Sequence, residues 1–381
     1  MPSPARADVD LAIVNYRSTA DVRSCLEALG PWERGRVWLV DNSAQEPGMA
    51  ADTASLRQAS ADMPWVTLLT PGVNLGFGRA CNLAFEQSKA DFLLLLNPDA
   101  RISNDGVLLL ARALAEQPRL GAVSPKIYWN EQRSFVLPAA FAQTPWYSVA
   151  LALATRWRTL AQWAARRGVK RAMRQMASAQ AFEVGFLAGS VLMLRRSAVL
   201  QAGGLFDPDY FMFYEDSDLS LRLRRVGFKL AILPTASAVH GYRHKAFKAD
   251  LMAQSQQQYF SKQYPFFYRL SDRLARVEAL ARPVLAPEWF KVLAQPVHSA
   301  SEFAQQTGGA SVLALSPSML MMPAMFRPSV TEARCLDDQE WALLEPAAYV
   351  ALMAGMQGRG EWNWVYFERA VDGARPAPAD S

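Results

Sequence analysis

Three carboxylates stand within four residues, at Glu215, Asp216 and Asp218, directly after an aromatic run that begins at Phe206. Aromatic side chains exclude water, whereas a carboxylate needs water, a partner or a metal. Mutual repulsion and desolvation would raise the proton affinity of at least one of them, which is how a protein obtains a general base. Acidic residues also suit a helix N-terminus, where they complement exposed N–H groups. Both interpretations hold together, because the residues up to Arg225 continue as a helix.

Four short apolar runs in the first hundred residues must position the partners of these carboxylates. Segments with helical spacing separate the runs, and this alternation predicts an α/β fold with a doubly wound, Rossmann-like, mostly parallel sheet. In such a sheet the ligand lies beyond the carboxyl ends of the strands. The predicted strands are residues 9–14, 37–40, 66–69 and 92–96, and the predicted helices are residues 19–29, 79–88 and 106–117.

Polar residues follow each of the four runs, and three of the ends carry a cluster of Asn or Asp. Turn chemistry also favours Asn and Asp in loops, which is enough to explain any single cluster. Four polar ends on one edge of a sheet favour a binding site instead. The third end contains Gly76 and Gly78, which permit close backbone approach, although the segment is neither a Walker loop nor GxGxxG.

The order and spacing of motifs over roughly residues 8–250 resemble those of the inverting family 2 glycosyltransferases, which have a GT-A fold. The resemblance is closest to the rhamnosyltransferase-like branch that builds bacterial surface polysaccharides. No single motif is strong, but eight in register are specific. The matching stretches are residues 13–16, 40–43, 74–78 with Asn82, 95–100, 185–190, 203–207 and 214–219, and finally His240.

The resemblance implies a role for each matched position. Asp216 would take the proton of the acceptor hydroxyl, with Glu215 and Asp218 holding acceptor hydroxyls or tuning its pKa. In-line attack would then invert the anomeric carbon without a covalent intermediate. The nucleotide-sugar side would be formed by Asn15, Tyr16, Asp41, Asn74, Gly76, Gly78, Asn82, Asn97 and Asp99, and the acceptor side by Gly189, Phe211 and Tyr214.

The resemblance also implies a divalent metal. Asp99 stands at the last position of the family's DxD-like motif and would bind Mg²⁺ or Mn²⁺ at the diphosphate, with His240 as a second ligand; hard cations prefer oxygen ligands. Asn97 replaces an acidic residue of that motif, which lowers the charge of the site. A lone His after a strand is otherwise more often structural. The basic residues 243–245 follow, and either one of them clamps the diphosphate or all are solvated.

Residues 131–182 are expected to form a basic helical insert. No acidic residue lies between Glu131 and Glu183. Apolar residues at helical spacing beside basic ones suit a helix lying on an anionic bilayer; a core-facing helix with a solvated basic face is the alternative. The stripe is Trp146, Val149, Leu153, Trp157 and Leu160, and the eight basic residues are Arg133, Arg156, Arg158, Arg166, Arg167, Lys170, Arg171 and Arg174. Nucleic-acid binding is not expected, because no recognition motif accompanies them.

The resemblance ends near residue 250, so residues 1–250 are predicted to form the GT-A domain. Residues 251–284 are interpreted as a helical extension, with a break at Pro265. Residues 285–381 form an appendage of unknown function, either α/β or mostly helical. Within it the pattern predicts strands at residues 311–315 and 362–367 and a helix at residues 337–353.

The composition sets the compartment. The chain has 381 residues, a net charge of +5 and three widely spaced cysteines, which favour a reducing compartment over a disulfide framework. The N-terminus lacks the apolar core of a signal peptide, and no apolar run is long enough to span a membrane. A cytoplasmic protein is expected, with peripheral contact to the inner face of the plasma membrane.

Together these features predict an inverting transferase that moves L-rhamnose from dTDP-L-rhamnose to a hydroxyl of a lipid-linked glycan in cell-surface polysaccharide biosynthesis. The same chemistry with a UDP- or GDP-sugar is the first alternative. A non-catalytic nucleotide-sugar-binding scaffold is the second, and a nucleotidyltransferase, which would need a glycine-rich loop after the first strand, is the third. The pattern leaves the acceptor linkage, a strict metal requirement and the oligomeric state open.

Overall fold

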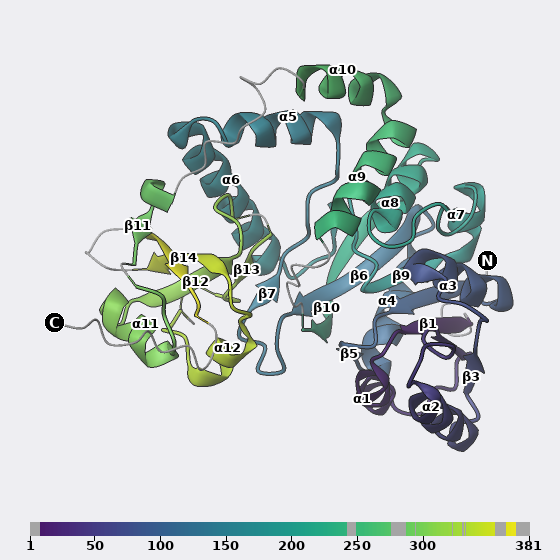
Figure 1. Ribbon diagram of the computed structural model, residues 1–381. Coiled ribbons are helices and arrows are strands. Elements are labelled where there is room, and N and C mark those ends of the chain that lie inside the picture. The colour runs from purple at the N-terminus through teal and green to yellow at the C-terminus, as the bar shows by residue number, and fades with distance from the viewer. Residues whose placement is uncertain are drawn as a thin grey trace.

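The computed structural model describes residues 8–241, 249–275 and 287–370, apart from residues 294, 322, 330, 332 and 355–362. The strands found in these residues join into one fifteen-stranded mixed sheet. Its N-terminal strands lie at one end of the molecule and its C-terminal strands at the other, with a group of helices above the middle (Figure 1).

The N-terminal part of the sheet is parallel. It is formed by β1 (Val9–Asn15), β2 (Val37–Asp41), β3 (Val66–Leu69) and β4 (Phe92–Leu96). Strand β1 is central, since Leu11 pairs with Val37 of β2 and Val9 pairs with Phe92 of β4, while β3 extends the sheet beyond β2. The four predicted strands and their parallel, doubly wound order are therefore confirmed.

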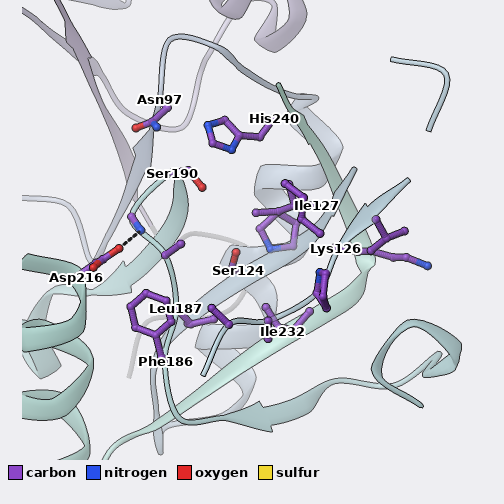
Figure 2. A pocket seen from close by; sticks show the side chains of 18 of the residues that line it. Asn97, Ser124, Lys126, Ile127, Phe186, Leu187, Ser190, Asp216, Ile232 and His240 are labelled. Carbon is purple, nitrogen blue, oxygen red and sulfur yellow. Dashed lines mark hydrogen bonds between the residues drawn. The ribbon is translucent and has the colours of Figure 1, made fainter. Parts of the chain in front are cut away.

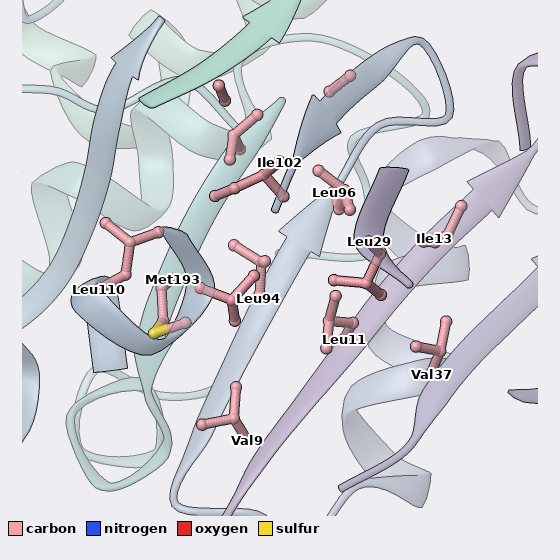
Figure 3. Close-up of a cluster of buried hydrophobic side chains, with 14 of the residues drawn as sticks. Val9, Leu11, Ile13, Leu29, Val37, Leu94, Leu96, Ile102, Leu110 and Met193 are labelled. Carbon is pink, nitrogen blue, oxygen red and sulfur yellow. The ribbon is translucent and has the colours of Figure 1, made fainter. Parts of the chain in front are cut away.

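Helices cover both faces of this part because successive side chains of a strand point to opposite sides. On one face, Leu11 and Leu94 lie in a cluster with α1 (Thr19–Leu29) and α4 (Asn104–Glu116), as Figure 3 shows for part of the cluster. On the other face, Ala12 and Leu95 lie in a cluster with α3 (Gly76–Gln87). The remaining helix, α2 (Ala50–Asp62), packs beside β3.

The sheet changes direction at β9 (Val191–Arg195), which runs antiparallel between β4 and β6 (Leu120–Tyr128). Strand β10 (Lys229–His240) is parallel to β6 and antiparallel to the short strands β5 (Ala100–Ile102) and β8 (Phe182–Val184). Between β9 and β10 lie α7 (Arg196–Gln201) and α8 (Glu215–Arg225). His240 stands opposite Ala100 in the β10–β5 pairing. The last residue of β10 therefore lies beside the loop that follows β4.

The predicted basic insert contains two helices, α5 (Pro145–Ala154) and α6 (Arg158–Ala177), after the short strand β7 (Val136–Leu137). Helix α5 begins where the Thr144 hydroxyl accepts a 3.1 Å hydrogen bond from the N–H of Tyr147. The helical prediction is confirmed, although the apolar stripe is divided between the two helices. Val169 and Met176 of α6 are buried against the C-terminal strands. In the part of the chain that is described, no helix is both long and apolar enough to cross a bilayer.

The next described helices after β10 are α9 (Ala249–Gln263) and α10 (Pro265–Ala275). The break at Pro265 is as predicted, since proline cannot donate to the preceding turn. Tyr259 of α9 is buried in an aromatic cluster with Tyr210, the residue that lies upstream of α8. Lys262 of α9 contacts the carboxylates of Asp207 and Asp209 at 2.7 and 2.6 Å. Helix α9 thus holds the aromatic stretch, residues 206–214, in place.

The C-terminal part is α/β, which confirms one of the two forms expected for it. Its elements are η3 (Pro287–Trp289), β11 (Lys291–Val292), α11 (Ala300–Thr307), β12 (Ser311–Ser316), β13 (Met325–Phe326), α12 (Asp338–Leu343), β14 (Ala348–Ala354) and β15 (Asn363–Glu368). Strands β12, β14 and β15 are antiparallel neighbours. The sheet is joined to the rest through Phe326 of β13, which pairs with Val136 of β7.

Both predicted strands of this part are confirmed within the described residues, but the helix predicted at residues 337–353 is wrong. It begins as expected, at a capping box formed by Asp337 and Glu340. It stops after Leu343 because Pro346 follows closely, and a proline disfavours the helical region for the residue before it. The apolar residues beyond it form the buried strand β14. The domain boundaries at residues 250 and 285 stay a prediction.

Candidate active site

A cavity of about 410 Å³ lies at the carboxyl edge of the sheet, between the start of α8 and the ends of β6 and β10. In Figure 2, Asp216 reaches it from α8, while Asn97 and His240 lie together at another side. The rest of the lining is largely apolar and includes Phe186 and Phe213. A concave apolar site with few polar groups is the usual form of a small-molecule site. Sequence reasoning brought Asp216 and His240 to one site, and the structure places both on this cavity.

Two strained residues set the direction of α8. Phe213 and Tyr214 have φ of 71° and 65°, in the left-handed region that bulky residues rarely adopt. Each such residue costs on the order of 1–3 kcal/mol unless its surroundings hold it. Here α9 does so, since Ser255 donates to the carbonyl of Met212 at 2.7 Å and Gln256 donates to the hydroxyl of Tyr214 at 2.8 Å. The strain turns the first carboxylates of α8 toward the cavity.

Asp216 has the surroundings of a general base. Its Oδ2 accepts a hydrogen bond from the N–H of Gly189 at 3.1 Å, and its Oδ1 accepts one from the N–H of Ser217 at 2.7 Å. Burial raises the pKa of Asp216 above the ordinary range, and the two N–H donors oppose the rise. The carboxylate is thus oriented, ionised near neutral pH and exposed to the cavity.

Glu215 precedes it and lies in the same wall of the cavity. Its side chain is buried, and among the described residues Oε2 has no hydrogen-bond partner. Burial, followed by the charge of Asp216, raises the pKa of Glu215 well above that of an ordinary Glu. Two adjacent carboxylates with raised pKa values favour a state in which Asp216 is ionised and Glu215 holds a proton.

Asp218 requires a correction, because the structure does not bring it to the cavity. It is two residues from Asp216 on α8, and residues at that spacing do not share a helix face. Its carboxylate is buried, pairs with Arg222 at 2.6 Å and accepts a hydrogen bond from Gln263 of α9 at 2.6 Å. Arg222 in turn donates to the carbonyl of Ala202. Asp218 therefore anchors α8 and lies outside the lining of the cavity, while its predicted role in tuning the pKa of Asp216 stays a prediction.

Asp99 and His240 form the candidate metal pair, with Oδ1 and Nε2 3.2 Å apart. Two ligands at 90° with metal–ligand distances of 2.0–2.1 Å would be about 3 Å apart, which fits Mg²⁺ or Mn²⁺. No cluster of three or more acidic, His or Cys side chains occurs in the described ranges. That fits as well, because Mg²⁺ usually takes one or two protein ligands and fills its shell with phosphates and water. Residues 243–245 lie outside the described residues.

The nucleotide side begins with a buried polar network at the ends of β1 and β2. Asp41 accepts hydrogen bonds from Asn15 at 2.9 Å, from the Ser43 hydroxyl at 2.9 Å and from Thr53 at 2.8 Å. Both Asn15 and Asp41 are almost fully buried. Tyr16 is different, since 43% of it is exposed, with Arg17 over its ring at 5.8 Å. The network fixes this edge of the sheet, and Tyr16 is exposed beside it.

Sequence reasoning missed Asn42 as a site residue, although it stood in a matched motif. Its amide donates to Asn74 at 2.9 Å and to the carbonyl of Gly76 at 3.1 Å, while its oxygen accepts from the N–H of Leu75 at 2.9 Å. The signal was its place directly after Asp41 at a strand end. Asn42 ties the loop after β3 to β2 and so shapes the edge predicted for the nucleotide.

The glycines of that loop also need a different explanation. A Cβ on Gly76 would lie 2.3 Å from the carbonyl oxygen of Phe211, and one on Gly78 would lie 3.3 Å from that of Tyr210. The N–H of Phe77 donates to the same Phe211 carbonyl at 2.9 Å. Close approach was predicted, but the partner is the aromatic stretch before α8. The two glycines join the edge predicted for the nucleotide to the segment that leads into Asp216.

Two further residues predicted for the site, Asn82 and Tyr214, contact other parts of the chain instead. Asn82 donates to the carbonyl of Phe206 at 2.8 Å and accepts from its N–H at 2.9 Å, so both ends of its amide are engaged. The ring of Tyr214 packs on Tyr259 of α9, at 5.5 Å between centroids, and does not line the cavity. Phe211 is half exposed beside Gly76. Of the predicted acceptor side, Gly189 lines the cavity.

The sheet has a doubly wound parallel half followed by an antiparallel strand. A carboxylate–His pair lies at its edge, and a buried carboxylate lies on the same cavity. This is the arrangement of a glycosyltransferase of GT-A fold. The family model described as Glycosyltransferase like family 2 matches residues 5–263 of the chain. The chain belongs to this family, and the match includes the cavity and α9.

Curated relatives that match the chain are rhamnosyltransferases. The N-acetylglucosaminyl-diphospho-decaprenol L-rhamnosyltransferase of Mycobacterium tuberculosis is 34% identical over 195 residues, which are 48% of this chain and 60% of the relative. Rhamnosyltransferase WbbL of Escherichia coli is 35% identical over 101 residues, which are 25% of this chain and 37% of the relative. The chain thus spans less than two thirds of the length of either.

Solved structures with similar topology are also glycosyltransferases. The mannosyltransferase PcManGT from Pyrobaculum calidifontis, in complex with GDP-Man and Mn²⁺, has a TM-score of 0.46 and 18% identity over 74% of each chain. GalNAc-T7 with UDP, GalNAc and Mn²⁺ has a TM-score of 0.48 and 13% identity over 74% of this chain and 52% of that one. At these values the likeness concerns overall topology only.

Proposed function

We propose that the protein is an inverting glycosyltransferase that moves a sugar from a nucleotide diphosphate to a hydroxyl of a lipid-linked glycan in cell-surface polysaccharide biosynthesis. The observation that carries the proposal is the position of Asp216 on the same cavity as His240, the partner of Asp99. A base on one side and a diphosphate site on the other are what direct displacement at a sugar carbon requires.

In this reaction Asp216 accepts the proton of the attacking hydroxyl, and that hydroxyl forms the new bond on the face opposite the departing diphosphate. The N–H groups of Gly189 and Ser217 keep the carboxylate aimed at the cavity. Glu215 is neutral in its protonated form, so it does not place a second negative charge beside the carboxylate of Asp216. Phe186 and Phe213 exclude water, which limits hydrolysis of the donor.

Asp99 and His240 would hold Mg²⁺ or Mn²⁺. The metal, when bound, neutralises charge on the nucleotide diphosphate as it departs. Asn97 lies beside His240 at the cavity edge (Figure 2) and offers an amide to the donor without adding negative charge. Tyr16, exposed at the end of β1, would pack on the nucleobase.

L-Rhamnose from dTDP-L-rhamnose is the proposed donor, on the ground that the curated relatives are rhamnosyltransferases. A UDP- or GDP-sugar with the same chemistry is the alternative. A non-catalytic scaffold is disfavoured by the oriented carboxylate of Asp216, which a binding protein does not need. The acceptor class, a lipid-linked diphospho-sugar, follows the name of the mycobacterial relative.

A peripheral position on the inner face of the plasma membrane suits such an acceptor. Trp146 of α5 is 82% exposed and Phe266 of α10 is 81% exposed. Helices α5 and α10 lie at the same end of the molecule (Figure 1). Trp157 and Trp163 of the insert are also exposed, and every charged side chain of the insert after Glu131 is basic. Exposed aromatic side chains beside basic ones bind the interface of an anionic bilayer.

The donor is tested by thermal-shift measurements of the full chain with dTDP-, UDP- and GDP-sugars, with Mn²⁺ and with EDTA. Stabilisation by dTDP-L-rhamnose that EDTA abolishes is expected. Transfer to a synthetic lipid-linked N-acetylglucosaminyl diphosphate, with the product's anomeric configuration determined by NMR, tests the reaction. Absence of stabilisation by every nucleotide sugar would exclude the proposed activity.

A further inference from the structure

A second cavity, of about 460 Å³, lies between α5 and α6, outside the site described above. It is a groove with apolar walls and three guanidinium groups. It is lined by Phe141, Leu151 and Trp163 among other apolar residues, and by Arg167, Arg171 and Arg174. We call it the insert groove.

Two of the three guanidinium groups of the insert groove lie over aromatic rings. Arg171 lies over Phe141 at 4.1 Å from the ring centre, and Arg167 lies over Trp163 at 5.5 Å. Burial lowers the pKa of Arg171, so its charge is held at a cost in solvation. Within the ranges that the structure describes, neither side chain forms a salt bridge, and the sequence has no acidic residue from 132 to 182. Arg171 is half-buried, whereas Arg167 is exposed. A half-buried cation without a carboxylate partner favours an anionic ligand.

The insert groove is next to the catalytic cavity. Ala140 lines the catalytic cavity, and its neighbour Phe141 lines the groove. At the end of α6, Arg174 lines the groove, whereas Gln175 and Met176 line the catalytic cavity. The two spaces therefore share one wall. An acceptor with its sugar at Asp216 would have to pass over this wall to enter the groove.

We propose that the insert groove binds the diphosphate and the first isoprenoid units of a polyprenyl-diphosphate-linked acceptor. The diphosphate is held by the three arginines of the groove, Arg167, Arg171 and Arg174, and the apolar side chains of α5 and α6 contact the hydrocarbon. Charge complementarity selects this occupant, because a neutral lipid leaves the arginines unpaired and a free nucleotide leaves the apolar wall exposed. The assignment rests on the proposed function for its acceptor class.

Binding is tested on the full chain with farnesyl diphosphate as the probe, and with inorganic diphosphate and farnesol as its separate halves. Farnesyl diphosphate is expected to bind at least about tenfold more tightly than either half. A photoreactive farnesyl diphosphate should label peptides within residues 141–174. Equal affinity for inorganic diphosphate, or labelling confined to other peptides, would overturn the proposal.

Variants then separate the groove from general membrane contact. Arg171→Gln should weaken farnesyl diphosphate binding about tenfold, as expected for loss of a hydrogen bond to a charged group. Arg166→Gln, an exposed residue of the same helix outside the groove, is the matched control and should leave binding unchanged. Equal binding by both variants would contradict the assignment. Because Arg171 is partly buried, Arg167→Gln, at an exposed position, provides a second variant with less risk to folding.

The acceptor experiment distinguishes this proposal from the proposed function. With a lipid-diphosphate acceptor, Arg167→Gln and Arg171→Gln should raise KM and leave kcat near wild type. With a short alkyl glycoside that lacks diphosphate, their kinetics should equal those of wild type. If the wild type transfers sugar and both variants have the same KM as the wild type, the groove proposal is rejected and the proposed function stands. Absence of transfer with every donor, while farnesyl diphosphate still binds, would reject the proposed function alone.

Discussion

The backbone N–H of Gly189 donates a hydrogen bond to Oδ2 of Asp216, at 3.1 Å. This contact joins the loop before β9 to the first turn of α8, so the aim of the carboxylate depends on two separate segments. A Cβ on residue 189 would lie 3.4 Å from the ring of Phe77, at ordinary van der Waals contact, so the contact depends on the backbone N–H of this loop and not on the absence of a side chain. The N–H keeps the carboxylate oriented while burial raises its pKa.

Asp216→Asn should retain the fold and donor binding and should lose transfer by about 10²–10⁴-fold, the usual contribution of a general base. The amide oxygen can still accept from Gly189, so the loop should stay in place. Radiolabelled transfer and thermal shift with donor measure the two effects. Asp105→Asn, an exposed acid on α4, is the control. Near-normal transfer by Asp216→Asn would remove Asp216 as the base.

The pH dependence of transfer should follow the raised pKa of Asp216. The base works only when ionised, so kcat/KM should fall as pH drops through its folded-state pKa. Because that pKa is raised, the fall should begin well above the value of about 3.9 for an ordinary Asp. A pH–rate profile in buffers of constant ionic strength measures it. If the acid limb lies at the pKa of an ordinary Asp, the ionisation of the buried Asp216 does not control the rate of transfer.

Glu215→Gln should change how stability depends on pH. The folded-state pKa of Glu215 is raised above the unfolded value of about 4.3. Between the two values the folded protein binds more protons than the unfolded chain, so wild-type stability falls as pH rises through this window. Glutamine removes that loss, and the variant should gain stability over wild type as pH increases. Tm measured from pH 5 to 9 tests this; a Tm difference independent of pH would refute it.

The sequence alone was sufficient to predict the parallel half of the sheet, because four apolar runs with polar ends permit few arrangements. It also placed Asp216 and His240 at one site. It did not predict the partners of Asp218 and Asn82. Asp218 contacts Arg222 and Gln263, and Asn82 contacts the backbone of Phe206; Gln263 and Phe206 become neighbours of these residues only through packing. The spacing of Asp218 and Arg222, four residues apart on a helix, was a local signal of pairing.

The exposed aromatic residues of α5 and α10 should direct membrane binding. Trp146→Ser with Phe266→Ser should reduce flotation with anionic vesicles, because both side chains are more than 80% exposed and have apolar surface to bury. Leu200→Ser, at an exposed apolar position on α7, is the control. High salt should weaken binding of wild type, since the basic insert contributes by charge. Undiminished flotation of the double variant would exclude these helices as the contact.

Gly76→Ala should destabilise the protein by more than about 1 kcal/mol, because Gly76 has φ of 74° and a Cβ would lie 2.3 Å from the Phe211 carbonyl oxygen. Gly72→Ala is the matched control four residues earlier, since its Cβ would meet no atom within 4 Å. Urea unfolding measures both. The carbonyl that Gly76 approaches belongs to the stretch that leads into α8, so donor binding and transfer should weaken together in Gly76→Ala. If Gly76→Ala and Gly72→Ala are equally stable, the close contact between the nucleotide edge and the base-bearing segment does not exist.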